Sequence, residues 1–208
     1  MASRRVGGTE GYAEAASALV RQYESISFGD VHRSVSHLFP ATPGVILDIG
    51  AGTGRDAAGF AAIGHRVVAV EPTAALRTHA IALHQSPAIE WVDDSLPALR
   101  KLTARGELFD LVMLTAVWMH LDRRQRRQAM PNVAGLLRAE GVMMMSLRFG
   151  PVPAGRRMFV VSPEETAELA DAEGLSLVFR EDAQGSVLQS PGVSWTRLAF
   201  KKEAGVVA

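Results

Sequence analysis

Cysteine is absent from the 208 residues of this chain, and its absence excludes several kinds of chemistry at once. A chain without cysteine has no disulfide, no thiolate metal site and no cysteine nucleophile. Any nucleophile or base therefore has to come from another type of side chain.

An excess of charge of either sign is also missing, because 22 Lys and Arg residues balance 22 Asp and Glu residues. Such a chain has no overall field that gathers nucleic acid or an anionic membrane surface. The one basic cluster, Arg123–Arg127, follows Asp122 and lacks the interleaved aromatic residues of an RNA-binding patch. We interpret it as the solvated start of a helix, and we expect a small-molecule partner and no nucleic acid.

Long apolar runs are missing as well, since none approaches the roughly 18–20 residues that cross a bilayer. The sequence therefore predicts a cytoplasmic protein with no membrane partner. With 48% apolar residues, the chain can bury the core of one domain over residues 1–208. Within it, residues 1–40 are expected to form an N-terminal helical cover over a core of residues 41–208.

Strands and helices are predicted to alternate along most of the chain. Residues 11–38 have the apolar spacing of two short helices. Strands are predicted near 45–49, 67–70, 88–92, 109–114 and 142–147, and helices near 55–63, 73–84, 95–104 and 122–138. After a helix that begins at 162–165, segments 175–180 and 193–200 are expected to form an antiparallel pair. This order predicts an α/β fold with a doubly wound seven-stranded sheet, mostly parallel with an antiparallel last strand.

The segment 45–56, which reads VILDIGAGTGRD, is the most informative part of the chain. Its apolar run breaks at Gly50, Gly52 and Gly54, where a ligand can lie against the backbone and the start of a helix. Dinucleotide binders use the spacing Gly-x-Gly-x-x-Gly, and Arg55 stands where their third glycine should be. A nicotinamide-dependent oxidoreductase is thus disfavoured, while a tight turn that needs glycine only for packing remains an alternative.

Five segments in order resemble the motifs of the class I S-adenosylmethionine-dependent methyltransferases. They are Val45–Asp56, Val67–Glu71, Trp91–Pro97, Phe109–Ala116 and Leu136–Val142. A glycine loop alone is weak evidence, but five segments in sequence are strong. The resemblance implies a Rossmann-like fold with S-adenosylmethionine as the cofactor, bound across the carboxyl ends of the first, second and fourth strands.

The resemblance also implies roles for individual residues in holding the cofactor. Asp48 would lie near its ammonium group, and Glu71 would accept hydrogen bonds from its ribose diol. Asp94 would receive the adenine amino group, with Asp93 as its competitor and a plain helix N-cap as the other interpretation of this segment. The expected cofactor-binding residues are Asp48, Gly50, Ala51, Gly52, Gly54, Glu71, Pro72, Asp94, Ser95, Thr115 and Ala116.

The loop after the fourth strand is expected to face the methyl acceptor. It lacks the Asp/Asn-Pro-Pro-aromatic signature of enzymes that methylate adenine N6. His120 is the candidate catalytic base, because an imidazole of pKa about 6.5 can deprotonate a hydroxyl or an amine; a structural histidine is the alternative. The expected substrate-binding residues are Tyr12, Tyr23, Phe28, Trp118 and Arg148, although an aromatic at helical spacing also fits a core.

The sequence as a whole predicts in-line transfer of a methyl group to a small molecule, without a metal. An RNA or protein methyltransferase and a noncatalytic cofactor-binding module remain alternatives. The acceptor, the methylated atom and the oligomeric state are open at this point.

Overall fold

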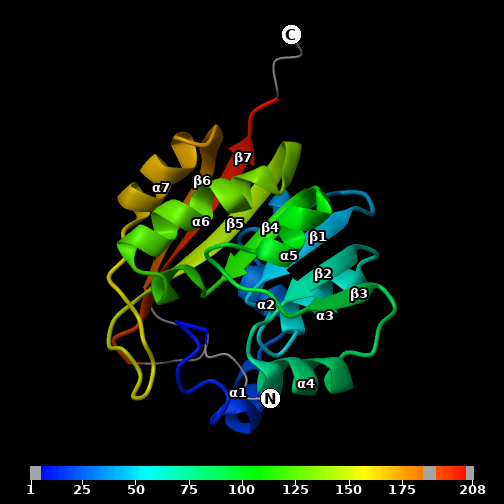
Figure 1. The fold of residues 1–208 in the computed structure, drawn as a ribbon, viewed down its shortest axis with the longest axis vertical. Coiled ribbons are helices and arrows are strands. Elements are labelled where there is room, and N and C mark those ends of the chain that lie inside the picture. The colour runs from blue at the N-terminus through cyan, green and yellow to red at the C-terminus, as the bar shows by residue number, and fades with distance from the viewer. Residues whose placement is uncertain (1–5, 185–190, 205–208) are drawn as a thin grey trace.

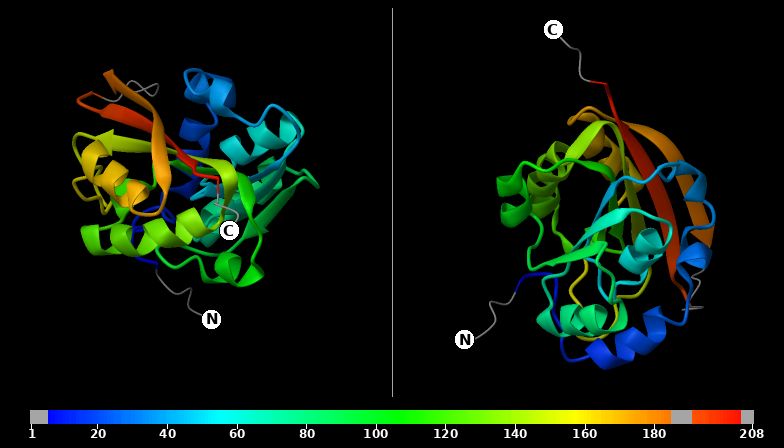
Figure 2. Two further views of the ribbon diagram at one scale, coloured as in Figure 1. Left: turned by 90° about the horizontal axis from the view of Figure 1, so that it is seen from above. Right: turned by 90° about the vertical axis from the view of Figure 1, so that its right-hand side faces the viewer.

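A twisted seven-stranded sheet with helices on both faces forms the centre of the molecule (Figures 1 and 2). The computed structural model describes residues 6–184 and 191–204. Its strands are β1 (Val45–Ile49), β2 (Arg66–Val70), β3 (Ile89–Val92), β4 (Phe109–Thr115), β5 (Leu137–Phe149), β6 (Leu175–Gln184) and β7 (Ser194–Lys202). They lie in the order β3-β2-β1-β4-β5-β7-β6.

The direction of the strands confirms the predicted topology. β1 to β5 pair in parallel, whereas β7 runs antiparallel to both β5 and β6. The chain adds β2 and β3 on one side of β1 and then crosses over to place β4 on the other side. The strand order therefore reverses at β1. Ligands of open α/β sheets bind at such a reversal, beyond the carboxyl ends of the strands.

Helices cover both faces because the central strands are apolar on both sides. Leu47 and Ile49 of β1 belong to the core beneath α5 (Arg100–Arg105), α6 (Arg123–Gly135) and α7 (Pro163–Asp171). Ile46 packs on the opposite face with Phe60 of α3 (Arg55–Ala62) and with α2 (Phe28–His32). Each such buried side chain stabilises the fold by about 1.5–3 kcal/mol.

The N-terminal segments lie at the end of the sheet where the parallel strands finish, at the bottom of Figure 1. There α1 (Ala16–Tyr23) packs against α4 (Ala74–Leu83) through Leu19 and Leu76. Two short 3₁₀ turns, η1 (Ser36–Leu38) and η2 (Trp118–His120), complete the elements. Within residues 6–184 and 191–204, no helix has both the length and the apolar content to cross a membrane.

Four predicted boundaries differ from the structure by three residues or more, and one of them is the end of β6, at Gln184 instead of near residue 180. α5 begins at Arg100, not near residue 95, because Leu99 adopts a left-handed φ of 45° just before it. α6 ends at Gly135, and β5 begins at Leu137, five residues earlier than expected. The apolar pattern at Leu136 and Leu137 fits a helix or a strand equally well. The pattern therefore does not predict where α6 ends and β5 begins.

The basic cluster does begin a helix, as predicted, but it is not wholly solvated. Asp122 caps α6 by accepting a hydrogen bond from Gln125 N at 2.8 Å. Arg126 is buried, where it donates to the Leu121 carbonyl at 2.6 Å and to Glu165 at 2.8 Å. This arginine therefore ties α6 to α7 and is not available to a polyanion.

Candidate functional site

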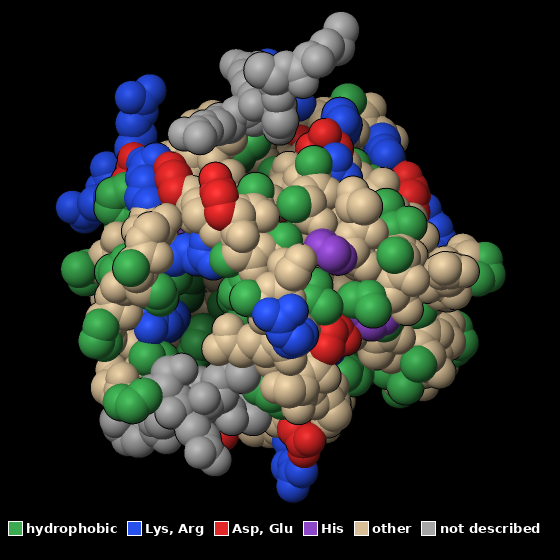
Figure 3. Space-filling model, turned by 90° about the horizontal axis from the view of Figure 1, so that it is seen from below, with side chains coloured by type: hydrophobic (Ala, Val, Ile, Leu, Met, Phe, Trp, Pro, Cys, Tyr) green, Lys and Arg blue, Asp and Glu red, His purple; other side chains and the backbone are tan. Residues whose placement is uncertain are grey.

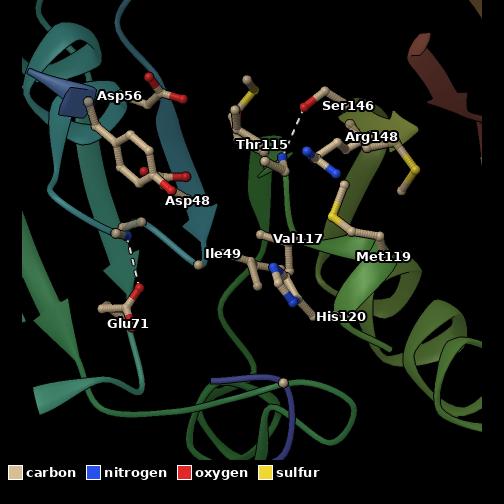
Figure 4. Close-up of a pocket in the computed structure, with 18 of the residues that line it drawn as sticks. Asp48, Ile49, Asp56, Glu71, Thr115, Val117, Met119, His120, Ser146 and Arg148 are labelled. Carbon is tan, nitrogen blue, oxygen red and sulfur yellow. Dashed lines mark hydrogen bonds between the residues drawn. The ribbon is translucent and has the colours of Figure 1, made fainter. Parts of the chain in front are cut away.

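The described residues enclose a cavity of about 730 Å³ at the carboxyl ends of the parallel strands. Figure 3 shows this face from below, hollowed beside a group of basic side chains. The loops after β1, β2, β4 and β5 line the cavity together with α1 and the residues that precede it. Figure 4 shows acidic side chains on the β1–β2 side, facing residues from β4, η2 and β5.

The loop after β1 is folded against the ends of the neighbouring strands. The N–H groups of Gly50 and Ala51 both donate to the Val70 carbonyl, at 2.8 and 2.9 Å. Gly50 has a φ of 74°, and a Cβ there would lie 2.5 Å from Val117. A Cβ on Gly52 would meet no atom nearer than 3.9 Å, so this residue leaves open space beside the cavity that it lines.

Gly54 has a different role from the one predicted, because it does not line the cavity. Its φ is 89°, and a Cβ there would lie 2.6 Å from Trp91 and 2.8 Å from His84. Glycine is needed at this position for the turn into α3 and for close packing against β3 and α4. The packing alternative from the sequence thus holds for this one glycine.

Glu71 closes the loop from the end of β2, as Figure 4 shows. One carboxylate oxygen accepts from Gly52 N at 2.9 Å and the other from Thr73 N at 2.7 Å. Burial raises the pKa of this carboxyl, and these N–H groups act in the opposite direction. Each oxygen can accept a further hydrogen bond, so the residue can hold a diol from the cavity side.

Asp48, one residue before the end of β1, is a buried acid that lines the cavity. Its Oδ2 has no hydrogen-bond partner among the described residues. Burial raises the pKa of Asp48 well above its usual range, and repulsion from Asp56 adds to this effect. A cationic group in the cavity would supply the missing partner.

Asp56, on the first turn of α3, is buried close by but is fully paired. Its carboxylate lies 2.9 Å from His32 Nε2 and accepts from Arg55 Nε at 2.8 Å. These two basic groups lower the pKa of Asp56 despite its burial. The pairing also joins α2 to the helix that follows the glycine loop.

Asp94 lines the cavity, but its carboxylate also caps α5. Oδ2 accepts from the N–H groups of Lys101 at 2.7 Å and Leu102 at 3.1 Å, while Oδ1 accepts from Ser95 N at 2.9 Å. Asp93 points elsewhere and pairs with Arg77 at 3.3 Å. Asp94 thus accepts from the first turn of a helix, but it is not the N-cap that the sequence suggested, because α5 begins at Arg100 and its N-cap is Leu99. Asp94, and not Asp93, lines the cavity.

The other expected cofactor residues are found at the same cavity. Ala51, Pro72, Ser95, Thr115 and Ala116 all line the cavity. Ala116 has a left-handed φ of 59°, and its N–H donates to Ser146 Oγ of β5 at 2.9 Å, the bond drawn in Figure 4. Ser146 was missed at the sequence level, because nothing in an apolar strand pattern marks one serine as a loop anchor.

His120 stands on the side of the cavity opposite Glu71, with both ring nitrogens engaged (Figure 4). Nδ1 lies 2.8 Å from the Arg157 carbonyl oxygen, and Nε2 lies 3.0 Å from the Tyr12 hydroxyl. A carbonyl only accepts, so in the neutral ring Nδ1 carries the proton and Nε2 accepts from Tyr12. Burial lowers the pKa of His120, and the Arg156 and Arg148 guanidiniums act in the same direction.

Of the five expected substrate-binding residues, Tyr12, Tyr23 and Arg148 line the cavity. Burial raises the pKa of both phenols, and the Arg156 guanidinium lies 3.9 Å from the centre of the Tyr12 ring. Arg156, from the Pro- and Gly-rich loop after β5, lines the cavity as well, although it is not one of the five expected substrate-binding residues.

Phe28 and Trp118 are corrections, because neither lines the cavity. Phe28 packs in an aromatic cluster, with its ring 4.8 Å from that of Phe60 and 5.7 Å from that of Phe39. Trp118 is fully buried in the core beneath η2. Large apolar rings gain more from burial between packed helices than from the edge of a polar site, and this preference decides both positions.

Comparison with protein families matches residues 46–141 to a methyltransferase domain. This range spans the glycine loop, Glu71, Asp94 and His120. Comparison with curated protein sequences gives no match.

Solved structures with the same fold include enzymes that transfer methyl groups. The 1,6-didemethyltoxoflavin-N1-methyltransferase of Burkholderia thailandensis, crystallised with its substrate and S-adenosylhomocysteine, is 21% identical with a TM-score of 0.69, over 98% of this chain and 93% of that one. A TehB-like S-adenosylmethionine-dependent methyltransferase of Corynebacterium glutamicum is 23% identical with a TM-score of 0.68, over 92% and 98% of the two chains. The 4+2 cyclase SpnF superposes with a TM-score of 0.73 at 14% identity, over 98% and 97%.

At these identities, the solved structures establish the fold and not the reaction. The methyltransferase domain model matches residues 46–141, and this range holds the glycine loop and the acidic residues near the ends of β1 and β2. The comparisons therefore show a match to a methyltransferase domain over this part of the chain and a fold shared with these solved structures.

Proposed function

We propose that the chain transfers a methyl group from S-adenosylmethionine to a small molecule in the cavity described above. The observation that carries this proposal is the buried, unpartnered Oδ2 of Asp48, in the same cavity as Glu71 and His120. The cofactor has a cationic amino group that suits Asp48 and a ribose diol that suits Glu71. When bound, it supplies a methyl group on a positive sulfur that is already activated for displacement.

The chain's own residues would hold the cofactor along the β1–β2 side of the cavity. Gly52 leaves the space that a bound molecule needs, and Glu71 can accept from the two ribose hydroxyls. Asp94, with Ser95 beside it, borders the cavity where an adenine edge would lie. Its cap of α5 occupies part of its accepting capacity, so adenine would share this carboxylate with two backbone N–H groups.

His120 is proposed as the group that accepts the acceptor's proton. The Arg157 carbonyl fixes the proton of the ring on Nδ1, and the free electron pair on Nε2 faces Tyr12. An incoming hydroxyl or amine would take the place of the Tyr12 hydroxyl at Nε2 and give up its proton there. Tyr12 then positions the imidazole before the acceptor enters and is not itself the base, because burial raises the pKa of its phenol.

Three further expectations remain predictions from the sequence. These are a cytoplasmic location, the absence of a nucleic-acid partner, and residues 1–40 as a cover over a single domain. Among the described residues, no group of three His, Asp or Glu side chains is arranged to hold a metal ion. The oligomeric state and the methylated atom are left open.

The proposed function can be tested with S-adenosylmethionine labelled in its methyl group and fractionated cell extract. We expect label in a small-molecule fraction with the natural sequence and none with Gly52→Val, whose side chain fills the ligand space. Label in RNA or protein instead would favour a macromolecular acceptor. Cofactor binding with no labelled product in any fraction would favour a noncatalytic module or another reaction on this fold, as in the cyclase.

A further inference from the structure

The cavity has an acidic side and a basic side. Asp48, Asp56, Glu71 and Asp94 line it from the elements at and after β1, β2 and β3. Arg148 lines it from the end of β5, and Figure 4 shows its side chain entering the cavity opposite Asp48 and Glu71. The proposed cofactor occupies the acidic side, so Arg148 belongs to the side left for the acceptor.

Arg148 has no carboxylate partner within the described residues. No ion pair joins it to an acid within 4.0 Å, and its side-chain contact is a long one from Nη1 to Met158 Sδ, at 3.9 Å. The segments outside the described ranges, 1–5, 185–190 and 205–208, contain no Asp or Glu. No acidic side chain of this chain is therefore left to pair with this guanidinium.

The other arginines of the cavity are engaged with the protein. Arg55 pairs with Asp56 at 2.8 Å, and Arg197 pairs with Glu181 at 3.0 Å. Arg156 donates to the Glu10 carbonyl at 3.2 Å and stacks on Tyr12. Among these four, Arg148 alone presents a guanidinium to the cavity whose one acceptor in the described ranges is a thioether.

The surroundings of Arg148 are apolar. Met158 Sδ lies 3.9 Å from Arg148 Nη1, and Trp195 is the cross-strand neighbour of Arg148 in β7. Further methionines line the same cavity, namely Met113, Met119, Met144 and Met145. Thioether side chains adapt to the shape of a flat or irregular ligand. Because these neighbours exclude water, an ion pair formed there would be stronger than one at the surface.

From this arrangement we propose that the methyl acceptor is an apolar small molecule with one carboxylate, which Arg148 binds. The inference rests on the proposed function, because it assigns the acceptor of the same site. A guanidinium presents parallel N–H groups that match the two oxygens of a carboxylate. Arg156 also has no carboxylate partner among the described residues, but its guanidinium is held over the Tyr12 ring and by the Glu10 carbonyl. The apolar neighbours of Arg148 favour a singly charged carboxylate over a phosphate monoester, which carries about −1.5 to −2.

The test is calorimetric titration with matched probes that differ only in charge. Each pair consists of an acid and its amide: 4-hydroxybenzoate with 4-hydroxybenzamide, 4-hydroxycinnamate with 4-hydroxycinnamamide, and 2-naphthoate with 2-naphthamide. Titrations are run with and without saturating S-adenosylhomocysteine. We expect at least one acid to bind about tenfold or more tightly than its amide, as a charge-assisted pair in an apolar site predicts.

Substitutions test whether the preference for the acid over its amide depends on Arg148. Arg148→Gln should abolish the acid preference, and Arg148→Lys should keep part of it. Arg124→Gln is the matched control, because it removes the same charge from the exposed side of α6, away from the cavity. Arg148→Gln should fold normally, since within the described residues the side chain makes no ion pair and only one weak hydrogen bond, to Met158.

The outcomes separate this inference from the proposed function. Failure of every acid to bind better than its amide, or an acid preference that survives in Arg148→Gln, would overturn the inference. Tighter binding of 2-naphthyl phosphate than of 2-naphthoate would replace the carboxylate with a phosphate. A tenfold loss of S-adenosylhomocysteine affinity in Arg148→Gln would move Arg148 to the cofactor. If S-adenosylhomocysteine does not bind but the acids do, the proposed function fails and the carboxylate site stands.

Discussion

Asp48 and Asp56 are two buried carboxylates on either side of the glycine loop, and only Asp56 has basic partners. His32 and Arg55 lie 2.9 and 2.8 Å from its oxygens, whereas Asp48 Oδ2 has no hydrogen-bond partner among the described residues. The pKa of Asp48 is raised by burial and by Asp56, while its partners lower the pKa of Asp56. Asp48 is thus available to a ligand, whereas Asp56 already pairs with basic side chains of the protein.

We expect Asp-to-Asn substitutions at positions 48 and 56 to change the free energy of unfolding at neutral pH in opposite directions. Asp48→Asn should stabilise the ligand-free protein by about 1–2 kcal/mol, since it removes an unpartnered buried charge. Asp56→Asn should destabilise it by about 2–4 kcal/mol, since it leaves His32 and Arg55 without a counter-charge. Urea denaturation of the two variants measures both effects.

The pH dependence follows from the directions of the two pKa values. The raised pKa of Asp48 means that its contribution favours folding at low pH and becomes less favourable as pH rises. The lowered pKa of Asp56 means that its contribution is present above the pKa of the unfolded chain and is lost as pH falls. A stabilising effect of Asp48→Asn that did not shrink on acidification would contradict this assignment.

Gly52 and Gly54 should respond differently to alanine although both have a left-handed φ. Gly52→Ala should fold with a strain of about 1–2 kcal/mol and lose cofactor affinity, because its Cβ enters open space beside the cavity. Gly54→Ala should carry the same strain and, in addition, a contact of 2.6 Å between its Cβ and Trp91. Position 54 does not line the cavity, so this variant should lose stability more than cofactor affinity. Thermal melts and S-adenosylhomocysteine titration of both variants separate the two roles; equal losses of affinity at equal stability would refute the distinction.

Asp94 and Asp93 form a second matched pair. Asp94→Asn should weaken cofactor binding and also destabilise the protein by about 0.5–2 kcal/mol, because it disturbs the cap of α5. Asp93→Asn removes only a half-exposed pair with Arg77 and should change stability by about 0.5 kcal/mol or less. Calorimetric titration and melting curves provide the comparison, and a larger affinity loss in Asp93→Asn would move the adenine contact to that residue.

The pH profile of turnover reports on His120. A base must be neutral, and burial lowers the pKa of this imidazole. Once an acceptor is known, kcat/KM should therefore stay constant at neutral pH and fall only below the ordinary histidine value of about 6.5. His120→Ala should remove this acidic limb together with most of the turnover. An unchanged profile in His120→Ala would show that the histidine is only structural.

Much of the fold was predictable because its strands are short, apolar and regularly spaced between helices. The residues proposed to hold the cofactor could also be predicted from the sequence. They lie at or near the ends of two strands, and in a parallel sheet these ends meet at one edge; the residues are Asp48, Gly50, Gly52 and Glu71. The start of α5 could not be predicted in this way. Its position depends on the left-handed backbone at Leu99 and on a carboxylate six residues before the helix.

The acceptor side was predicted less well for a physical reason. Phe28 and Trp118 have the same local pattern as cavity residues, and only the packing of α2 and η2 places them in the core. The partners of Arg148 and the tautomer of His120 depend on contacts with residues 157 and 158, which lie in a loop with no periodicity. Such long-range contacts cannot be read from spacing.

Titration of the protein with S-adenosylhomocysteine, with NAD as the comparison ligand, tests the central claim most directly. We predict binding of one S-adenosylhomocysteine per chain and no binding of NAD. Glu71→Ala should weaken the first interaction by about 1–3 kcal/mol, through loss of the hydrogen bonds to the ribose diol. Binding of NAD in place of S-adenosylhomocysteine, or an affinity unchanged in both Glu71→Ala and Gly52→Val, would contradict the account.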